Sequence, residues 1–298
     1  MSRVKPFLKW AGGKRQLLRE LRPFYPTEFN AYWEPFAGSG AVFFDLWSQG
    51  LLAGRPAHLI DTNKDLIVCY RTVRDDVEGL IRLLGSLQRR HARDAQRTFD
   101  TVRRDFNTRR LEVLDSTVQQ GDIEHASMLI YLNRTGFNGL FRLNARGAFN
   151  VPLGRYAHPV ICDGDNLRAV SRILNEPLVE THCGSFETVL QSAAPGDFIY
   201  FDPPYAPLSA TSNFRSYTAE GFSSADQKRL QEAVITLARR GCRVLLSNSS
   251  APEIEQLYGD NTEARRAGLR FTRVKARRAI NSKASSRGAI DEVIVTNR

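Results

Sequence analysis

An acid, two prolines and a tyrosine stand together at positions 202 to 205. Asp202, Pro203, Pro204 and Tyr205 directly follow the apolar run 198–201, which predicts a buried strand. Active sites of open α/β sheets lie at the carboxyl ends of strands, where this motif would stand. We therefore interpret Asp202, Pro203 and Tyr205 as candidate catalytic residues.

These residue types suit chemistry at the amino group of a nucleobase. Such a nitrogen is a poor nucleophile, because its lone pair is delocalised into the ring. The Asp202 carboxylate and a prolyl carbonyl can each accept one N–H, and the prolines add no competing backbone donor. Tyr205 offers a face for a base extruded from its stack. A sulfonium methyl donor is already activated, so alignment would supply most of the acceleration and no metal is expected.

A glycine-containing turn near the N-terminus predicts the binding site for such a donor. Residues 34–40 include Gly38 and Gly40, which let the backbone turn sharply and approach a ligand, and Phe36 lies beside them. Asp61 ends the next predicted strand, 57–61, at a spacing typical of an acid that binds ribose hydroxyls. The third glycine of the dinucleotide fingerprint is missing, which favours a mononucleoside-like cofactor over a nicotinamide. An ordinary strand–helix turn would also explain the glycines.

A second candidate for donor binding precedes this turn, in residues 7–14. Gly12 and Gly13 predict a tight turn that brings Lys14 back near Trp10. Trp10 could cover the sulfonium or the adenine of the donor, and Lys14 could pair with its carboxylate. A surface turn with a half-buried tryptophan is the alternative. The candidate cofactor-binding residues are Trp10, Lys14, Phe36, Gly38, Gly40, Asp61 and Asp202.

Residues 131–160 have the composition of a nucleic-acid-reading segment, with four arginines, five aromatic residues and no acid. Asn138 and Gly139 predict a tight hairpin turn. Phe137 and Leu140 near its tip could wedge into a base stack. Arg142 and Arg155 are candidates for contacts to guanine, and Asn138 for contact to an adenine or the orphaned base. A hairpin with solvated arginines would look similar.

The overall charge supports a polyanionic partner. The chain has a formal net charge of +10, and residues 264–283 hold eight Lys or Arg and no acid. This second basic block could follow phosphates, although charged residues are also common on edge strands. The candidate DNA-binding residues are Lys9, Arg134, Phe137, Asn138, Leu140, Arg142, Arg155, Arg277 and Arg278.

Patterning along the 298 residues predicts one α/β domain made from both ends of the chain. Residues 1–62 and 190–298 would form the catalytic domain, including a helix over 224–240 and a strand over 243–247. Residues 63–189 would form an inserted target-recognition domain; within it, 71–110 carry 11 arginines against 6 acids. Two consecutive domains are the alternative.

Several functional classes are disfavoured by what the sequence lacks. The four cysteines have no paired spacing, which argues against a zinc site or a disulfide scaffold and suits a reducing cytosol. No apolar run is long enough to span a bilayer, and the first residues lack a secretory signal. We therefore expect a cytoplasmic protein with no membrane partner.

The motifs together resemble the Dam-like, D12 class, alpha group DNA adenine-N6 methyltransferases. The similar blocks follow the family order: residues 7–14, 34–40, Asp61, 132–134, 149–156 and 202–205. The resemblance implies a Rossmann-like methyltransferase sheet with helices on both faces, plus a mostly helical DNA-recognition insertion with a β-hairpin. It implies S-adenosyl-L-methionine contacts from Trp10, Lys14, Asp61 and Asp202, and target-adenine contacts from Asp202 and Tyr205. It also implies a monomer that acts on double-stranded DNA, on the nucleoid of a bacterium.

The resemblance also implies a target, most often GATC. Phe137 stands where many relatives have tyrosine, and residues 279–288 look more like members of restriction systems, which implies a partner endonuclease acting on the same site. Two alternatives stay open. One is an N4-cytosine methyltransferase, which usually has serine in place of Asp202, and the other is a catalytically silent DNA-binding regulator.

Overall fold

The computed structural model describes residues 4–10, 14–115, 122–206, 222–277 and 289–297. It divides into two compact units. Residues 14–60 and 184–298 form the sheet unit, and residues 1–13 and 61–183 form the helical unit. No helix among the described residues is both long enough and apolar enough to cross a membrane. The assignment of a catalytic domain and an inserted recognition domain stays a prediction.

Six of the seven strands in the described residues build the sheet of the sheet unit, in the order β2-β1-β4-β5-β7-β6. Strands β2, β1, β4 and β5 pair in parallel, whereas β7 is antiparallel to both β5 and β6. The bounds are β1 Tyr32–Glu34, β2 Ala57–Asp61, β4 Phe198–Phe201, β5 Arg243–Ser249, β6 Arg270–Arg277 and β7 Ala289–Thr296. The strands predicted at 57–61, 198–201 and 243–247 are therefore confirmed.

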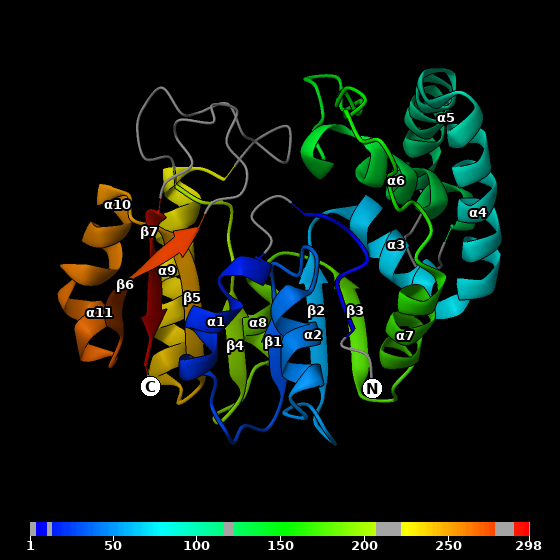
Figure 1. The fold of residues 1–298 in the computed structure, drawn as a ribbon. Helices are drawn as coiled ribbons and strands as arrows, with labels where there is room; N and C mark the ends of the chain where they lie inside the picture. The colour runs from blue at the N-terminus through cyan, green and yellow to red at the C-terminus, as the bar shows by residue number, and fades with distance from the viewer. Residues whose placement is uncertain (1–3, 11–13, 116–121, 207–221, 278–288, 298) are drawn as a thin grey trace. The chain divides into compact units, whose positions relative to one another are not determined.

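Both faces of this sheet are apolar and covered. Ile199 and Phe201 of β4 pack in one core cluster with Leu230 of α9. The ring of Phe198, on the opposite face, packs against the rings of Tyr25 and Phe29. Figure 1 shows α2 on one side of the strands and α9 on the other. The mixed α/β class with helices on both faces is thus confirmed. The helical segments are η1 Lys14–Gln16, α1 Leu18–Leu21, η2 Arg22–Phe24, α2 Ala41–Ser48, α8 Thr188–Ser192, α9 Ser224–Arg239, α10 Pro252–Ile254, η5 Glu255–Gly259 and α11 Thr262–Arg266.

Local sequence determines where the longest of these helices begins and ends. Ser223 caps α9 by accepting from the backbone of Asp226, whose carboxylate accepts from the backbone of Ser223 in return. Gly241 follows the helix with φ +92°, a conformation that glycine adopts without strain. These two signals confirm the predicted helix to within one residue.

Four helices of the helical unit, which include the largely buried α6, begin at acidic or amide N-caps. Buried Asp65 of α3 accepts from Arg110 of α5 at 2.8 Å and contacts His125 of α6 at 2.9 Å, so one carboxylate ties three helices together. The elements are α3 Lys64–Asp75, α4 Val77–Arg93, α5 Ala95–Asp115, α6 Ile123–Thr135, η3 Phe137–Gly139, α7 Gly164–Leu174 and β3 Val179–Cys183.

Candidate active site and DNA-recognition segment

The glycine turn and the Asp202 motif follow two neighbouring parallel strands. Strand β1 ends at Glu34, and β4 ends at Phe201, directly before Asp202. The strand order reverses between β1 and β4, and such a reversal opens a crevice where α/β proteins bind ligands. Gly38 and Gly40 have φ of +49° and +66°, so the predicted turn does need glycine at both positions.

Glu34 holds this turn against the helix that follows it. Its carboxylate is buried and accepts from the Tyr32 hydroxyl at 2.8 Å and from the backbone N–H of Phe43 at 3.2 Å. The second bond joins the end of β1 to the first turn of α2. Glu34 was not predicted as a functional residue, because neither of its partners is recognisable before the strand and the helix are placed.

Asp202, Lys14 and Tyr205 form the centre of the candidate site. The Lys14 ammonium lies 2.6 Å from the Asp202 carboxylate and 4.3 Å from the centre of the Tyr205 ring. The Lys14 side chain is only 6% exposed, and that of Asp202 is 19% exposed. Ser247 of β5 donates to the same Asp202 oxygen at 3.2 Å. The carboxylate is therefore oriented and partly shielded from water, as an acceptor for a substrate N–H would need to be.

The environment of Asp202 changes its acidity. Burial raises the pKa of Asp202 to about 6, and the neighbouring Lys14 ammonium opposes part of this effect. Glu292 contributes in the same direction as burial, because a second negative charge nearby disfavours ionisation. Asp202 is thus ionised at neutral pH and becomes protonated under mildly acidic conditions.

We expect methyl transfer to decline as the pH falls through about 6, because a protonated Asp202 loses acceptor capacity for the substrate amino group. Initial rates at saturating substrates, measured from about pH 5 to about pH 8.5, would show this acid limb. DNA binding and secondary structure, followed over the same range, separate loss of catalysis from loss of folding. A flat rate profile through about pH 6 would contradict the assigned role.

A buried amide network fixes the backbone that carries the motif. Gln227 of α9 donates to the carbonyl of Pro204 at 3.0 Å and accepts from Asn248 of β5 at 3.1 Å. The Asn248 side-chain oxygen in turn accepts from the backbone of Ala206 at 3.3 Å. Since the Pro204 carbonyl is engaged, we expect the carbonyl of Pro203 to be the second acceptor for a substrate amino group.

Asn248→Ala should weaken both folding and turnover. The substitution leaves buried polar groups of Gln227 and Ala206 without partners, which lowers the free energy of unfolding by about 1–3 kcal/mol. Turnover should fall as well, because the loop that carries Asp202 loses its support. Chemical denaturation and steady-state rates measure the two effects. Gln256→Ala, at an exposed amide in the same unit, serves as the control, and equal stability of the two variants would argue against the network.

An aromatic wall adjoins the glycine turn. The Phe36 ring stacks on Phe186 with ring centres 5.6 Å apart and an angle of 22°, and meets the edge of Phe222 at 5.7 Å. Flat apolar surfaces of this kind accommodate a purine ring. Phe36 therefore stays a candidate for donor binding, together with Gly38, Gly40, Lys14 and Asp202 of the same unit.

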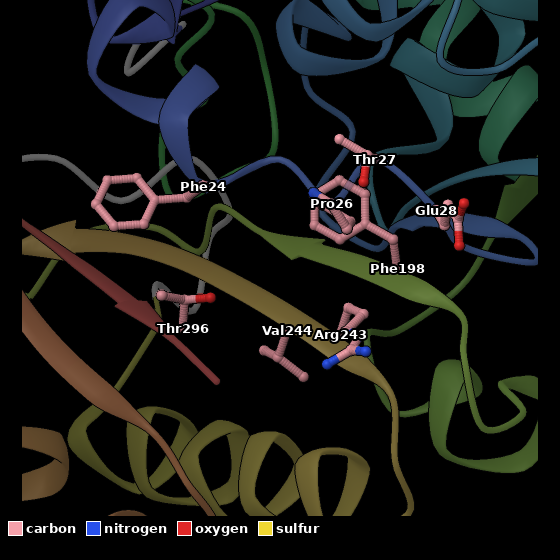
Figure 2. A pocket seen from close by; sticks show the side chains of 8 residues that line it. All are labelled: Phe24, Pro26, Thr27, Glu28, Phe198, Arg243, Val244 and Thr296. Atoms are coloured by element: carbon pink, nitrogen blue, oxygen red, sulfur yellow. The ribbon is translucent and has the colours of Figure 1, made fainter. Parts of the chain in front are cut away.

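A separate cavity of about 230 Å³ lies at the ends of the strands that are opposite to Asp202. Its lining includes Phe198 and Arg243, the first residues of β4 and β5, and Thr296 at the end of antiparallel β7 (Figure 2). Asp202 follows the other end of β4. The position of this cavity, at the amino ends of the parallel strands, therefore excludes it as the site that the motifs predict.

In the helical unit, Asn133 ties the start of the chain to the end of α6. Its side-chain oxygen accepts from the backbone of Lys9 at 2.8 Å, and its amide donates to the carbonyls of Lys9 at 2.5 Å and Gly139 at 2.9 Å. Arg134 donates to the carbonyl of Phe7 at 2.8 Å. These bonds place Lys9 beside the candidate DNA-reading segment, residues 131–160, with its ammonium 4.6 Å from the Tyr156 ring centre.

The predicted hairpin turn at Asn138 and Gly139 is wrong in type. Both residues have positive φ, 55° and 64°, but they form the short 3-10 turn η3 directly after α6. Antiparallel pairing occurs further on, with Leu143 opposite Phe149 and a turn that closes with a bond from Gly147 to Asn144. The end of α6 and the Asn133 bond to Gly139 override the hairpin signal. Phe137 is nevertheless 45% exposed, and Leu140 is half-buried.

The arginines of this segment differ in their surroundings. Arg142 is exposed, and its guanidinium donates to the Asn150 side chain at 2.8 Å and to the Asn150 carbonyl at 3.2 Å. Arg155 is also exposed. Arg277 lies in β6, whereas Arg278 lies outside the described residues. The DNA contacts of all these residues stay predictions.

Two further candidates for donor binding belong to the helical unit. The Trp10 ring stacks on Phe141 with ring centres 5.5 Å apart, and the Asp61 carboxylate accepts from the backbone of Asn63 at 2.9 Å. The predicted turn at Gly12 and Gly13 lies outside the described residues. Contacts of Trp10 and Asp61 with a methyl donor therefore stay predictions.

Comparison with known proteins defines the class. The family model for D12 class N6 adenine-specific DNA methyltransferases matches residues 10–280. The chain is 41% identical to the type II methyltransferase M1.LlaDCHI of Lactococcus lactis, covering 99% of this chain and 95% of that protein. It is 38% identical to the type II methyltransferase M.MjaIII of Methanocaldococcus jannaschii, covering 99% of both chains. It is 33% identical to the DNA adenine methylase of Escherichia coli, covering 99% of this chain and 95% of that protein.

This chain therefore belongs to the D12 class N6 adenine-specific DNA methyltransferases, and the resemblance drawn from its motifs is confirmed. It is an adenine-specific DNA methyltransferase, and its family uses S-adenosylmethionine. The sheet unit fits that donor chemically. Asp202 lies 2.6 Å from the Lys14 ammonium, and Glu292 adds a second carboxylate close enough to Asp202 to raise its pKa, so the surroundings of Asp202 carry negative charge that suits a sulfonium.

Proposed function

We propose that this protein transfers a methyl group to the N6 nitrogen of an adenine that is flipped out of double-stranded DNA, with GATC as the target. The observation that supports the proposal best is the Asp202 carboxylate at the end of β4, buried beside Lys14 and held by Ser247. It stands where a flipped base would be expected to present its amino group. The donor supplies an electrophilic methyl carbon on a sulfonium sulfur.

In this proposal the residues of the motif bind and activate the amino group. Asp202 accepts one N–H and the Pro203 carbonyl accepts the other, which leaves the nitrogen lone pair free for in-line attack. The new N–C bond forms as the S–C bond breaks, and one amino proton then leaves to solvent. Tyr205 stacks on the base. Lys14 changes partner from Asp202 to the donor carboxylate when the site fills.

Target reading is proposed for the segment after α6. Exposed Phe137 would enter the base stack and, with Leu140, help to extrude the adenine. Arg142 and Arg155 would read guanines, Asn138 an adenine or the orphaned base, and Lys9, Arg134, Arg277 and Arg278 would support DNA binding. GATC follows from the resemblance to Dam-like enzymes.

We also propose a role in restriction–modification. Two relatives carry the name type II methyltransferase, and such an enzyme would protect DNA from a separate endonuclease that cuts the same site. The protein would act as a monomer, in the cytoplasm of a bacterium.

The test is methyl incorporation from labelled donor into short duplexes that differ at one base pair. A duplex with one GATC should accept label, and a duplex with any of the four pairs changed should accept much less. Replacing the target adenine by purine, which has no amino group, should abolish incorporation. Equal labelling of all duplexes would contradict the target, and labelling of the purine duplex would contradict the N6 position.

A further inference from the structure

We propose that Glu292 is a positioning residue for methyl transfer, which acts by holding the ring of Tyr205 through its hydroxyl group. The inference rests on the proposed function, in which the Tyr205 ring stacks on the target adenine. Glu292 lies on β7, far from the catalytic motif in sequence, opposite Ser249 of β5 and Val274 of β6.

The geometry that supports this role is direct. The Tyr205 hydroxyl donates to the Glu292 carboxylate at 2.7 Å, a short, charge-assisted hydrogen bond. Glu292 is only 8% exposed, and its strand is held on both sides by β5 and β6. Tyr205 lies on a loop, so a rigid partner at its far end fixes the plane of its ring.

A role for Glu292 in stability alone does not explain why a negatively charged side chain is buried at this position. A neutral acceptor could satisfy the Tyr205 hydroxyl at smaller cost, because burying a carboxylate is unfavourable without strong compensation. Here the carboxylate also lies close enough to Asp202 to raise its pKa. Among the residues that the structure describes, the groups that face Asp202 are Lys14 of η1, Tyr200 of β4, Tyr205, Ser247 of β5 and Glu292 of β7.

A double-mutant cycle tests whether Glu292 acts through Tyr205. Glu292→Ala and Tyr205→Phe should each lower kcat by about tenfold or more, because each frees the ring. The double variant should be no slower than the slower single variant, since both changes remove one interaction. If the kcat losses of the two single variants multiply in the double variant, or if Glu292→Ala leaves kcat unchanged, the proposal is wrong. Asp291→Ala, at the exposed neighbouring position, is the control and should keep normal kcat.

Glu292→Gln provides a second test that does not depend on the folding of the alanine variant. Its amide oxygen can still accept from Tyr205, so kcat at about pH 8 should recover most of the loss seen with alanine. Removing the negative charge should also move the acid limb of the rate profile to lower pH, because Asp202 then ionises more easily. The proposal is overturned if the kcat of Glu292→Gln is as low as that of Glu292→Ala. It is also overturned if the acid limb of Glu292→Gln lies at the same pH as that of the wild-type enzyme.

The wild-type enzyme separates this inference from the proposed function. If it transfers no methyl group to adenine in DNA, the proposed function fails. If it does so and the cycle shows independent effects, only the role of Glu292 fails.

Discussion

Asp202→Ala should lower the rate of methyl transfer by about 10²- to 10⁴-fold, the largest effect that we expect from a single substitution. In the proposed mechanism the carboxylate is the charged acceptor for the substrate amino group, and alanine would leave that nitrogen with one acceptor instead of two. Single-turnover rates with saturating DNA and donor measure the chemical step directly.

The control for this prediction is DNA affinity. It should change little, because the DNA around the target base is proposed to be bound by Lys9, Arg134, the segment after α6 and the pair Arg277 and Arg278, and not by Asp202. Since alanine also removes the carboxylate that lies 2.6 Å from the buried Lys14 ammonium, Asp202→Asn, which keeps the size of the side chain, is the companion variant that perturbs folding less. Turnover near the wild-type level in both variants would refute the role of Asp202.

Arg142→Ala should reduce discrimination between the cognate site and sites with one guanine replaced, by about 1–3 kcal/mol. The Arg142 guanidinium is exposed, and Asn150 contacts it through both its side chain and its carbonyl. Such support orients the guanidinium before DNA arrives, which favours recognition of one base.

The measurement is the ratio of kcat/KM values for matched duplexes that carry the cognate or the altered site. Arg146→Ala is the matched control, because Arg146 is exposed on the same turn and is not assigned a base. It should reduce affinity slightly for every duplex and leave the ratio unchanged. An unchanged ratio for Arg142→Ala would remove this residue from the reading set.

The parts of the fold that the sequence predicted correctly depend on local signals. An apolar run predicted β4, a glycine marked the end of the helix predicted over 224–240, and two glycines with positive φ form the turn after β1. Motif order then indicated that Asp202 and this turn would stand at the same edge of a parallel sheet. Each signal lies within a few residues of the structure that it specifies.

The residues that the sequence did not reveal act through distant partners. Gln227 and Asn248 support the loop that carries Asp202, and Glu292 contacts Tyr205 from a strand 87 residues further along the chain. Such pairs become recognisable only when the strand order is known. The hairpin turn was misplaced for a related reason, because the Asn138 and Gly139 pair follows a helix end that no local signal announced.

The central claim is that Asp202 activates an adenine amino group. The most direct measurement is nucleoside mass spectrometry of one duplex after separate incubation with the wild-type enzyme and with Asp202→Ala, at equal occupancy of donor and DNA. The account predicts N6-methyladenine from the wild-type enzyme and almost none from the variant. N4-methylcytosine as the product, or equal N6-methyladenine from both proteins, would contradict it.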